Sequence, residues 1–302
     1  MKKRGIVLMM TLVLITVLMG LVSLILTQSS RITRLGENSF SQSTSMLLVS
    51  DLERQLPTLL ASVTGAEQLD LAFRIPLQLE TKKGDFTLQA RLASPYKRVN
   101  INLLLTNDGK VNDPYVTLFT KLFAVYPIAD ADIFLKLIFD TIDLDTAERG
   151  VDTEIVLTRP DFKNGPIASE HQFYIILERY IELTGDTTIL SIAWDKYIGY
   201  EGDKMDFNAV NPEVLSLMIP SIAPERVRAL TLYRTKAYTT KEEAIAVEPL
   251  LAPLFDTYFF IYKPGTSYNL ICDVRLQQNF RKEHVKFFYN LTTKKVQYVE
   301  FI

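Results

Sequence analysis

The chain has 302 residues, of which 48% are hydrophobic, and a formal net charge of -2. This length fits one large domain or two small ones besides a membrane segment. Because the charges of 33 basic and 35 acidic residues nearly cancel, the composition excludes a strong positive electrostatic field that would attract nucleic acid or anionic lipid. A single cysteine, Cys272, excludes an internal disulfide, and its place in an alternating apolar pattern predicts that it is buried.

The amino-terminal segment predicts a membrane helix behind a short basic leader. Lys2, Lys3 and Arg4 precede Gly5, and the uncharged apolar run 6–26 follows at once. As a helix this run would be about 32 Å long at ~1.5 Å per residue, which matches a hydrocarbon core of roughly 30 Å. An ordinary secretory signal is shorter and ends in a small-x-small cleavage site, which does not follow here. The basic residues favour a single-pass topology with a cytoplasmic amino terminus and an exported body.

Two interpretations of this leader remain open. It is either part of an uncleaved single-pass anchor or a prepilin leader, which a prepilin peptidase cleaves between Gly5 and Ile6. In the second case Ile6 would become the N-methylated first residue of the mature chain. Both interpretations give the same topology.

Beyond the membrane the sequence predicts an α+β protein. Helix-compatible residues continue after the apolar run, so that one long helix over 6–56 is expected, half of it outside the membrane. Alternating apolar residues from Leu69 to Leu79 and from Phe86 to Leu92 then predict a β-hairpin around the turn 81–85. Its apolar face needs a cover, and the preceding helix is the nearest candidate.

The middle of the chain predicts an all-α insertion. Residues 116–254 read as short helices divided by prolines, and Asn211-Pro212-Glu213 predicts one helix start with Asn211 as its cap. Alternation returns in the last residues, so 57–115 and 255–302 are expected to complete one small antiparallel sheet across the insertion.

Several segments, in this order, resemble the minor pseudopilin K family of type II secretion. Besides the leader and anchor, Asn100–Leu103 resembles the family's Asn-Leu-Asn stretch, and Phe139–Asp145 resembles its Asp-Trp-Ile-Asp-x-Asp motif. Asp206–Leu215 resembles its Asn-x-Asn-Thr-Ala-x-x-Glu-Val-Leu block, and Tyr258–Ile261 resembles the strand that returns to the sheet. The chain departs from the family where Thr141 replaces a tryptophan and where Asn211-Pro212 stands for Thr-Ala.

Met10 agrees with this particular family. It is the fifth residue after Gly5, where most pilins and pseudopilins carry a glutamate. A carboxylate deep in a bilayer is costly and is kept only for a purpose. Protein K is the pseudopilin that characteristically lacks it, so Met10 favours K over the other pseudopilins.

The resemblance implies a fold and a function. The fold would be a long transmembrane and spine helix packed on a small antiparallel pilin-like sheet, with a large inserted all-α domain that contains a helix-hairpin-helix (SAM-like) element. The protein would initiate and cap the periplasmic pseudopilus, together with minor pseudopilins of the I and J type, in support of export across the outer membrane. It would be anchored in the bacterial inner membrane, with its carboxyl-terminal domain in the periplasm. No catalytic residue, nucleic acid or small-molecule substrate is expected.

The stretch from Asp130 to Glu154 is dense in carboxylates, which are ligands that Ca²⁺ prefers. The resemblance implies calcium in the inserted domain, and Asp140, Asp143 and Asp145 are the expected ligands. The spacing does not match an EF-hand, because Ala147 and Glu148 break that pattern. The alternative is a solvated acidic loop whose side chains cap helices.

Two other functions remain as alternatives. The chain could be a minor pilin of a type IV pilus, which shares the leader, or a membrane-anchored receptor that binds DNA through the helix-hairpin-helix element. Such elements bind phosphates through glycine amides, but the hairpin Pro220–Pro224 contains no glycine. No Gly-x-Ser-x-Gly, His-Glu-x-x-His or phosphate loop supports an enzyme.

Overall fold

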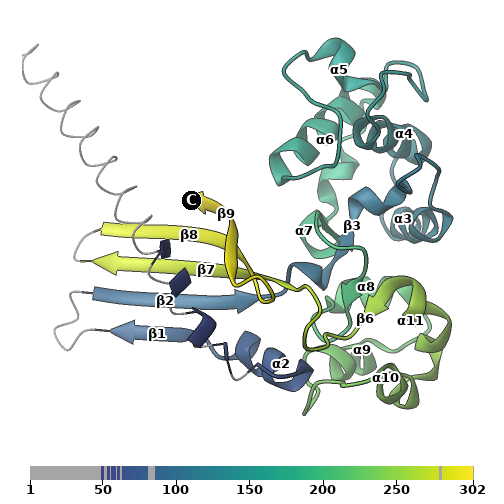
Figure 1. Cartoon of the computed structure of the whole chain (residues 1–302). Helices are drawn as coiled ribbons and strands as arrows, with labels where there is room; N and C mark the ends of the chain where they lie inside the picture. The colour runs from purple at the N-terminus through teal and green to yellow at the C-terminus, as the bar shows by residue number, and fades with distance from the viewer. Residues whose placement is uncertain are drawn as a thin grey trace, which may run out of the picture.

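A computed structural model describes residues 49–50, 53–54, 56–58, 60–61, 63–80, 86–278 and 281–301. The fold is α+β, with an antiparallel sheet on one side and a block of short helices on the other (Figure 1). Gly5, Ile6, Met10 and the apolar run 6–26 lie outside the described residues. Among the helices that are described, none is long and apolar enough to cross a membrane.

The sheet has five strands in the order β1-β2-β7-β8-β9, each antiparallel to its neighbour. The strands are β1 (Leu77–Glu80), β2 (Phe86–Ala93), β7 (Asn269–Gln278), β8 (Arg281–Asn290) and β9 (Lys295–Phe301). The two central neighbours β2 and β7 are far apart in sequence, and Ala93 at the end of β2 pairs with Ile271 near the start of β7. The chain therefore leaves the sheet and re-enters it at one place.

The helical insertion lies between these two strands. Its helices are α3 (Asp113–Val125), α4 (Ala131–Ile142), α5 (Ile155–Thr158), α6 (Glu170–Thr184), α7 (Trp194–Tyr197), α8 (Pro212–Met218), α9 (Pro224–Thr231), α10 (Lys241–Val247) and α11 (Ala252–Tyr258). Four 3-10 turns, η1 (Pro95–Lys97), η2 (Ile101–Leu104), η3 (Thr188–Ser191) and η4 (Pro249–Leu251), complete it. Two short parallel pairs, β3 (Val99–Asn100) with β4 (Ile198–Gly199) and β5 (Met205–Asp206) with β6 (Phe259–Phe260), hold distant segments together.

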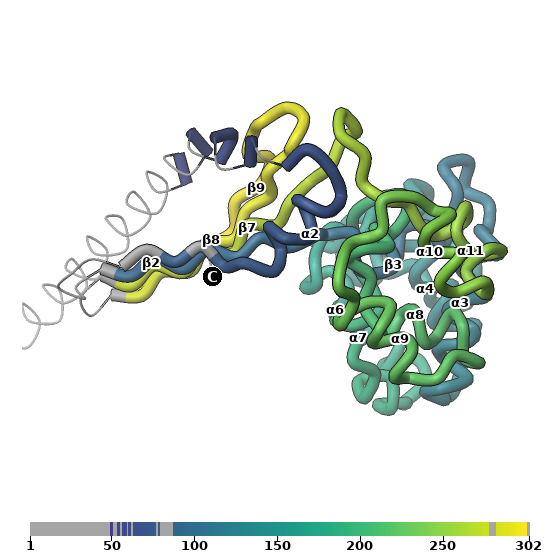
Figure 2. The backbone as a smooth tube through the Cα atoms, turned by 90° about the horizontal axis from the view of Figure 1, so that it is seen from below, coloured from purple at the N-terminus to yellow at the C-terminus, as the bar shows by residue number. Residues whose placement is uncertain are grey.

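One face of the sheet forms its core. Leu92, Cys272 and Phe287 lie side by side on three adjacent strands, and all three are buried. Val49 and Leu56, which precede the helix α2 (Ala66–Arg74) in the chain, are buried in the same cluster, and Figure 2 shows their segment over one face of the sheet. The predicted burial of Cys272 is thus confirmed, and this burial raises the pKa of its thiol to about 12.

The prediction of a strand from Leu69 onward was wrong for its first half, because residues Ala66–Arg74 form the helix α2. Leu69 is buried, whereas Leu71 is 55% exposed, as expected for a helix and not for a strand. Asp70 and Arg74 form an ion pair of 2.8 Å one helical turn apart, which a strand would not allow. The strand β1 begins only at Leu77, so the hairpin itself is present but shorter than expected.

The return strand was also misplaced. Phe259 and Phe260 form β6, which pairs with β5 inside the insertion, and the chain rejoins the large sheet only at Asn269. The cause is aromatic packing, because the ring of Phe259 lies 5.3 Å from that of Phe207 in the helical core.

Candidate functional site

The acidic motif predicted from sequence lies where α4 ends and the loop after it folds back. Asp140 is fully buried and accepts hydrogen bonds from the Thr153 hydroxyl at 2.5 Å and from the backbone N–H of Arg149. The Arg149 guanidinium donates to Asp143 at 2.9 Å and lies 3.4 Å from Asp140. Asp140 and Asp143 are therefore brought together. The Asp145 carboxylate points elsewhere, since it accepts from the backbone N–H of Ala147.

Two further residues join this group that the sequence did not single out as ligands. Glu154 is fully buried, and its carboxylate accepts from the side-chain amide of Asn164 at 2.8 Å. The same amide donates to the backbone carbonyl of Asp145 at 2.9 Å. Asn164 thus joins the Asp145 backbone to the Glu154 carboxylate across the loop. We define the acidic cluster as Asp140, Asp143, the Asp145 carbonyl, Glu154 and Asn164.

Three oxygens of the acidic cluster are left without a donor. Asp143 Oδ1, Glu154 Oε2 and Asn164 Oδ1 are buried and have no hydrogen-bond partner among the described residues. A buried polar atom without a partner costs free energy, which a cation at the cluster would recover. The charge of Arg149 partly offsets the three carboxylates.

The electrostatics of the acidic cluster favour added positive charge. Burial raises the pKa of Asp140, and the negative charge of Asp143 raises it further. Burial likewise raises the pKa of Glu154, with added contributions from Asp140 and Asp143. The three carboxylates therefore lie close enough to repel one another.

The donor set of the acidic cluster fits Ca²⁺, because carboxylate, amide and backbone oxygens are its usual ligands. Within the described ranges, no three histidine, cysteine, aspartate or glutamate side chains form a metal-ligating group by themselves. The amide of Asn164 and the carbonyl of Asp145 would therefore have to complete the coordination shell, and Arg149 would have to share Asp140 and Asp143 with the ion.

Asn102 and Asn208, which lie in two of the segments that resemble the family's motifs, hold distant loops in place. Asn102 accepts from the backbone N–H of Ile167 at 2.7 Å and donates to its carbonyl at 2.9 Å. Asn208 makes the same pair of hydrogen bonds with the backbone of Tyr238, accepting from its N–H and donating to its carbonyl at 2.9 Å each. Each asparagine thus fastens a distant loop as a neighbouring strand would, which explains the need for an amide side chain.

A buried polar network joins the insertion to the sheet. Asp206 in β5 accepts from the Tyr268 hydroxyl at 2.7 Å, and that hydroxyl also lies 2.7 Å from the Ser94 hydroxyl. Arg234 bonds to Asp70 of α2 and to the carbonyl of Asn208, two residues after Asp206. Burial raises the pKa of Asp206 to about 6. Polar contacts therefore fix how the insertion meets the sheet.

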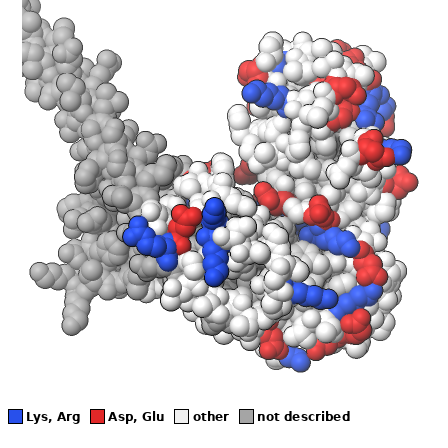
Figure 3. All heavy atoms as spheres, in the orientation of Figure 1, with Lys and Arg blue, Asp and Glu red and all other residues white. Residues whose placement is uncertain are grey.

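Where the helix-hairpin-helix element was predicted, the structure has the two short helices α8 and α9 joined by residues 219–223, and two basic residues of this region, Arg226 and Lys241, make contacts within the protein. Arg226 donates to the carbonyl of Val247 at 2.6 Å and pairs with Glu248. Lys241 pairs with Asp256 at 2.5 Å. On the face shown in Figure 3, acidic and basic side chains alternate over the insertion. This arrangement does not favour the nucleic-acid alternative.

Comparison with solved structures finds this fold in a chain of the crystal structure of the GspK-GspI-GspJ complex from the enterotoxigenic Escherichia coli Type 2 Secretion System. The two chains superpose with a TM-score of 0.58 and share 13% sequence identity. The match covers 88% of this chain and 98% of that chain. Comparisons with protein-family models and with curated proteins find no match. The predicted resemblance to a minor pseudopilin of the K type is confirmed at the level of the fold.

Proposed function

We propose that this protein is a minor pseudopilin that initiates and caps the periplasmic pseudopilus of a type II secretion system. The observation that supports this most directly is the shared fold, which spans the sheet and the large insertion of a protein from a complex that contains GspK, GspI and GspJ. The basic leader, the apolar run 6–26 and Met10 support it from the sequence. Its partners would be minor pseudopilins of the I and J type, and its role would be assembly without catalysis.

The position of the insertion supports a place at the filament tip. The helical block continues from one end of the sheet, beyond the ends of β2 and β7 (Figure 1). A subunit stacked on that end would meet the insertion before it could reach the sheet. A protein of this shape suits the first, outermost position of a filament that grows from the membrane.

The proposed cleavage of the leader is tested by measuring the mass and the amino-terminal sequence of the protein from native membranes. We expect a mature chain that begins with N-methylated Ile6, since a prepilin peptidase would cleave after Gly5. A chain that retains Met1 would be a plain anchor and would contradict the pilin-like assignment.

The tip role is tested by replacing residues 98–261 with a short Gly-Ser linker in the producing organism. We expect export to stop while the shortened protein still reaches the inner membrane. Normal export and normal assembly of the other minor pseudopilins would overturn the tip role. Normal export together with loss of surface pili would instead favour the type IV minor pilin, the alternative that shares the leader.

We further propose that the acidic cluster binds Ca²⁺. We expect calcium to raise the melting temperature of the full-length protein, and Glu154→Gln to abolish this gain. At a calcium concentration 100 times the Kd, binding stabilises the folded state by about 2.7 kcal/mol. The matched control is Glu148→Gln, an exposed acid of the same loop, which should keep the gain.

The effect of pH provides a second check on the calcium site. Because burial raises the pKa of Asp140 and of Glu154, protons compete with the ion, and calcium should bind more weakly as the pH falls. Titration calorimetry in two buffers of different ionisation enthalpy would detect the released protons. Equal stabilisation of the Glu154→Gln variant by calcium would contradict the site.

A further inference from the structure

A cavity of about 300 Å³ opens where the sheet meets the insertion. Its walls come from α2, from the end of β2 and the turn η1, from the segment before α8 and from the end of α9. Four charged side chains line it: Asp70, Arg74, Lys97 and Arg234. Neither the acidic cluster nor the proposed tip role uses this cavity.

Positive charge predominates in the cavity. Three of the four charged side chains are basic, so their formal sum is about +2 at neutral pH. The single acid, Asp70, is already engaged by Arg74 at 2.8 Å and by Arg234. No carboxylate of the cavity is therefore left to balance Lys97.

The Lys97 ammonium and the Nε–H of Arg234 lack an acceptor among the described residues. The Lys97 side chain has no hydrogen bond or ion pair to any described residue and is half-buried. Burial lowers its pKa, and the charges of Arg98 and Lys286 lower it further against a smaller opposite effect of Asp195. The Arg234 side chain is only 6% exposed, and its Nε is buried without an acceptor. An anionic group in the cavity would relieve both costs.

The segments that line the cavity also carry exposed apolar side chains. Leu232 lines the cavity and is 55% exposed, and its neighbour Tyr233 is 73% exposed. Leu71 in α2 and Ile75 just after it, which adjoin the cavity residues Asp70 and Arg74 in sequence, are 55% and 54% exposed. The two pairs are neighbours, because the Arg74 guanidinium donates to the Arg234 carbonyl at 3.4 Å. Exposed apolar side chains gathered beside a cavity mark a surface that another molecule can cover.

We propose that this cavity is a docking site for a peptide segment of another protein that carries a carboxylate flanked by apolar side chains. The carboxylate would accept hydrogen bonds from Lys97 and Arg234, and the flanking side chains would cover Ile75 and Tyr233. The volume lies at the small end of the range for ligand sites, roughly 300–1,000 Å³, so that it holds a few side chains and not a whole domain. Charge complementarity selects an acidic segment over a neutral one.

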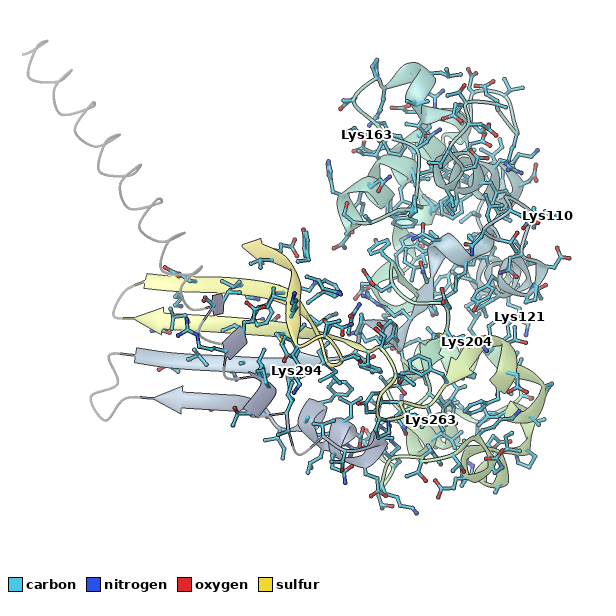
Figure 4. The ribbon with its side chains drawn as sticks, in the orientation of Figure 1. Lys110, Lys121, Lys163, Lys204, Lys263 and Lys294 are labelled. Carbon is cyan, nitrogen blue, oxygen red and sulfur yellow. The ribbon has the colours of Figure 1, made fainter. Side chains whose placement is uncertain are left out.

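The test measures the fluorescence anisotropy of two dye-labelled peptides with the full-length protein in detergent micelles. The probe is Leu-Asp-Leu-Phe amide, and its partner carries Asn in place of Asp. We expect the acidic peptide to bind at least tenfold more tightly, and Lys97→Gln to weaken its binding about tenfold through the loss of one charge-assisted hydrogen bond. Lys263→Gln is the matched control, because Lys263 is exposed and lies outside the cavity. Figure 4 labels Lys263.

A second variant tests the apolar contacts of the peptide without removing a charge from the cavity. Ile75→Ser alters only an exposed apolar side chain and should weaken the acidic peptide severalfold without changing the melting temperature. Equal binding of the two peptides, or unchanged binding by the Lys97→Gln variant, would overturn the proposal. Displacement of the peptide by low concentrations of inorganic phosphate, with no effect of Ile75→Ser, would show a site for free anions and would also overturn peptide docking. None of these outcomes depends on whether the protein serves secretion.

Discussion

At the scale of single residues, Asp206 has the most unusual environment of the polar groups described above. It is buried in β5 and accepts from the Tyr268 hydroxyl and from the backbone N–H of Asn208 at 3.0 Å. Burial is the main cause of its raised pKa, and these hydrogen bonds and the charge of Arg234 only partly oppose it. The folded protein therefore holds a carboxyl that ionises near pH 6.

We predict that Asp206→Asn removes one component of the pH dependence of stability. The pKa of Asp206 is about 6 in the folded state and ordinary in the unfolded state, so the folded protein binds the extra proton between about pH 4 and pH 6. The free energy of unfolding must therefore fall as the pH rises through this window, by roughly 3 kcal/mol at ~1.36 kcal/mol per pKa unit. Urea unfolding of both proteins at several pH values measures the difference. A difference that does not change with pH would contradict the assignment.

The acidic cluster shows how far residues could be identified from the sequence. The density of acids pointed to Asp140 and Asp143, and the structure brings these two together at Arg149. Glu154 and Asn164 were missed as ligands because they meet only after the loop beyond α4 folds back on itself, which no periodic pattern encodes. Asp145 joins through its backbone carbonyl, and a backbone contact leaves no signal in the side-chain sequence.

At the scale of elements, the helical conformation of α2 determines which of its leucines are buried and which are exposed. An alternating pattern over a few residues fits a strand as well as one side of a helix, so the sequence alone could not separate them. The tertiary contact from Asp70 to Arg234 and the burial of Leu69 against the sheet select the helix. Asn211 precedes α8 as predicted but makes no cap bond. Its amide donates to the carbonyl of Lys196 instead.

We predict opposite outcomes for two leucines in α2. Leu69→Ala should destabilise the protein by about 2–5 kcal/mol, because Leu69 is 1% exposed and its loss leaves a cavity. Leu71→Ala should change stability by less than about 0.5 kcal/mol, because its side chain is mostly exposed. Denaturant unfolding of both variants measures this. Equal losses would contradict the helix and return the segment to a strand.

At the scale of the whole molecule, the two cores are nearly separate. Among the described residues, the buried cluster of the insertion lies within 98–261 except for Ala66. The buried cluster of the sheet takes none of its members from 98–261. The order of sheet, insertion and sheet was predictable from the changes of hydrophobic period. The points of entry and exit were not, because short segments such as Val99–Asn100 pair only in three dimensions.

We predict that residues 98–261 fold when they are produced alone. Their buried side chains pack almost entirely against one another, so the isolated insertion should melt cooperatively and show dispersed amide resonances. Circular dichroism and NMR spectroscopy measure this. A broad, non-cooperative transition would mean that the sheet is needed as a template.

The entry and exit of the insertion also determine how the molecule carries mechanical load. Ala93 and Ile271, where the chain leaves and re-enters the sheet, are paired neighbours. A force on the insertion along the strand direction therefore moves β2 and β7 in the same direction. The ladder between these two strands carries no shear. The force is resisted in shear by the outer ladders, which join β2 to the four-residue β1 and β7 to the ten-residue β8. The β1 ladder has four residue pairs and the β8 ladder has ten, so the β1 ladder would yield first. The short β1 ladder therefore limits the load that can pass from the insertion into the sheet.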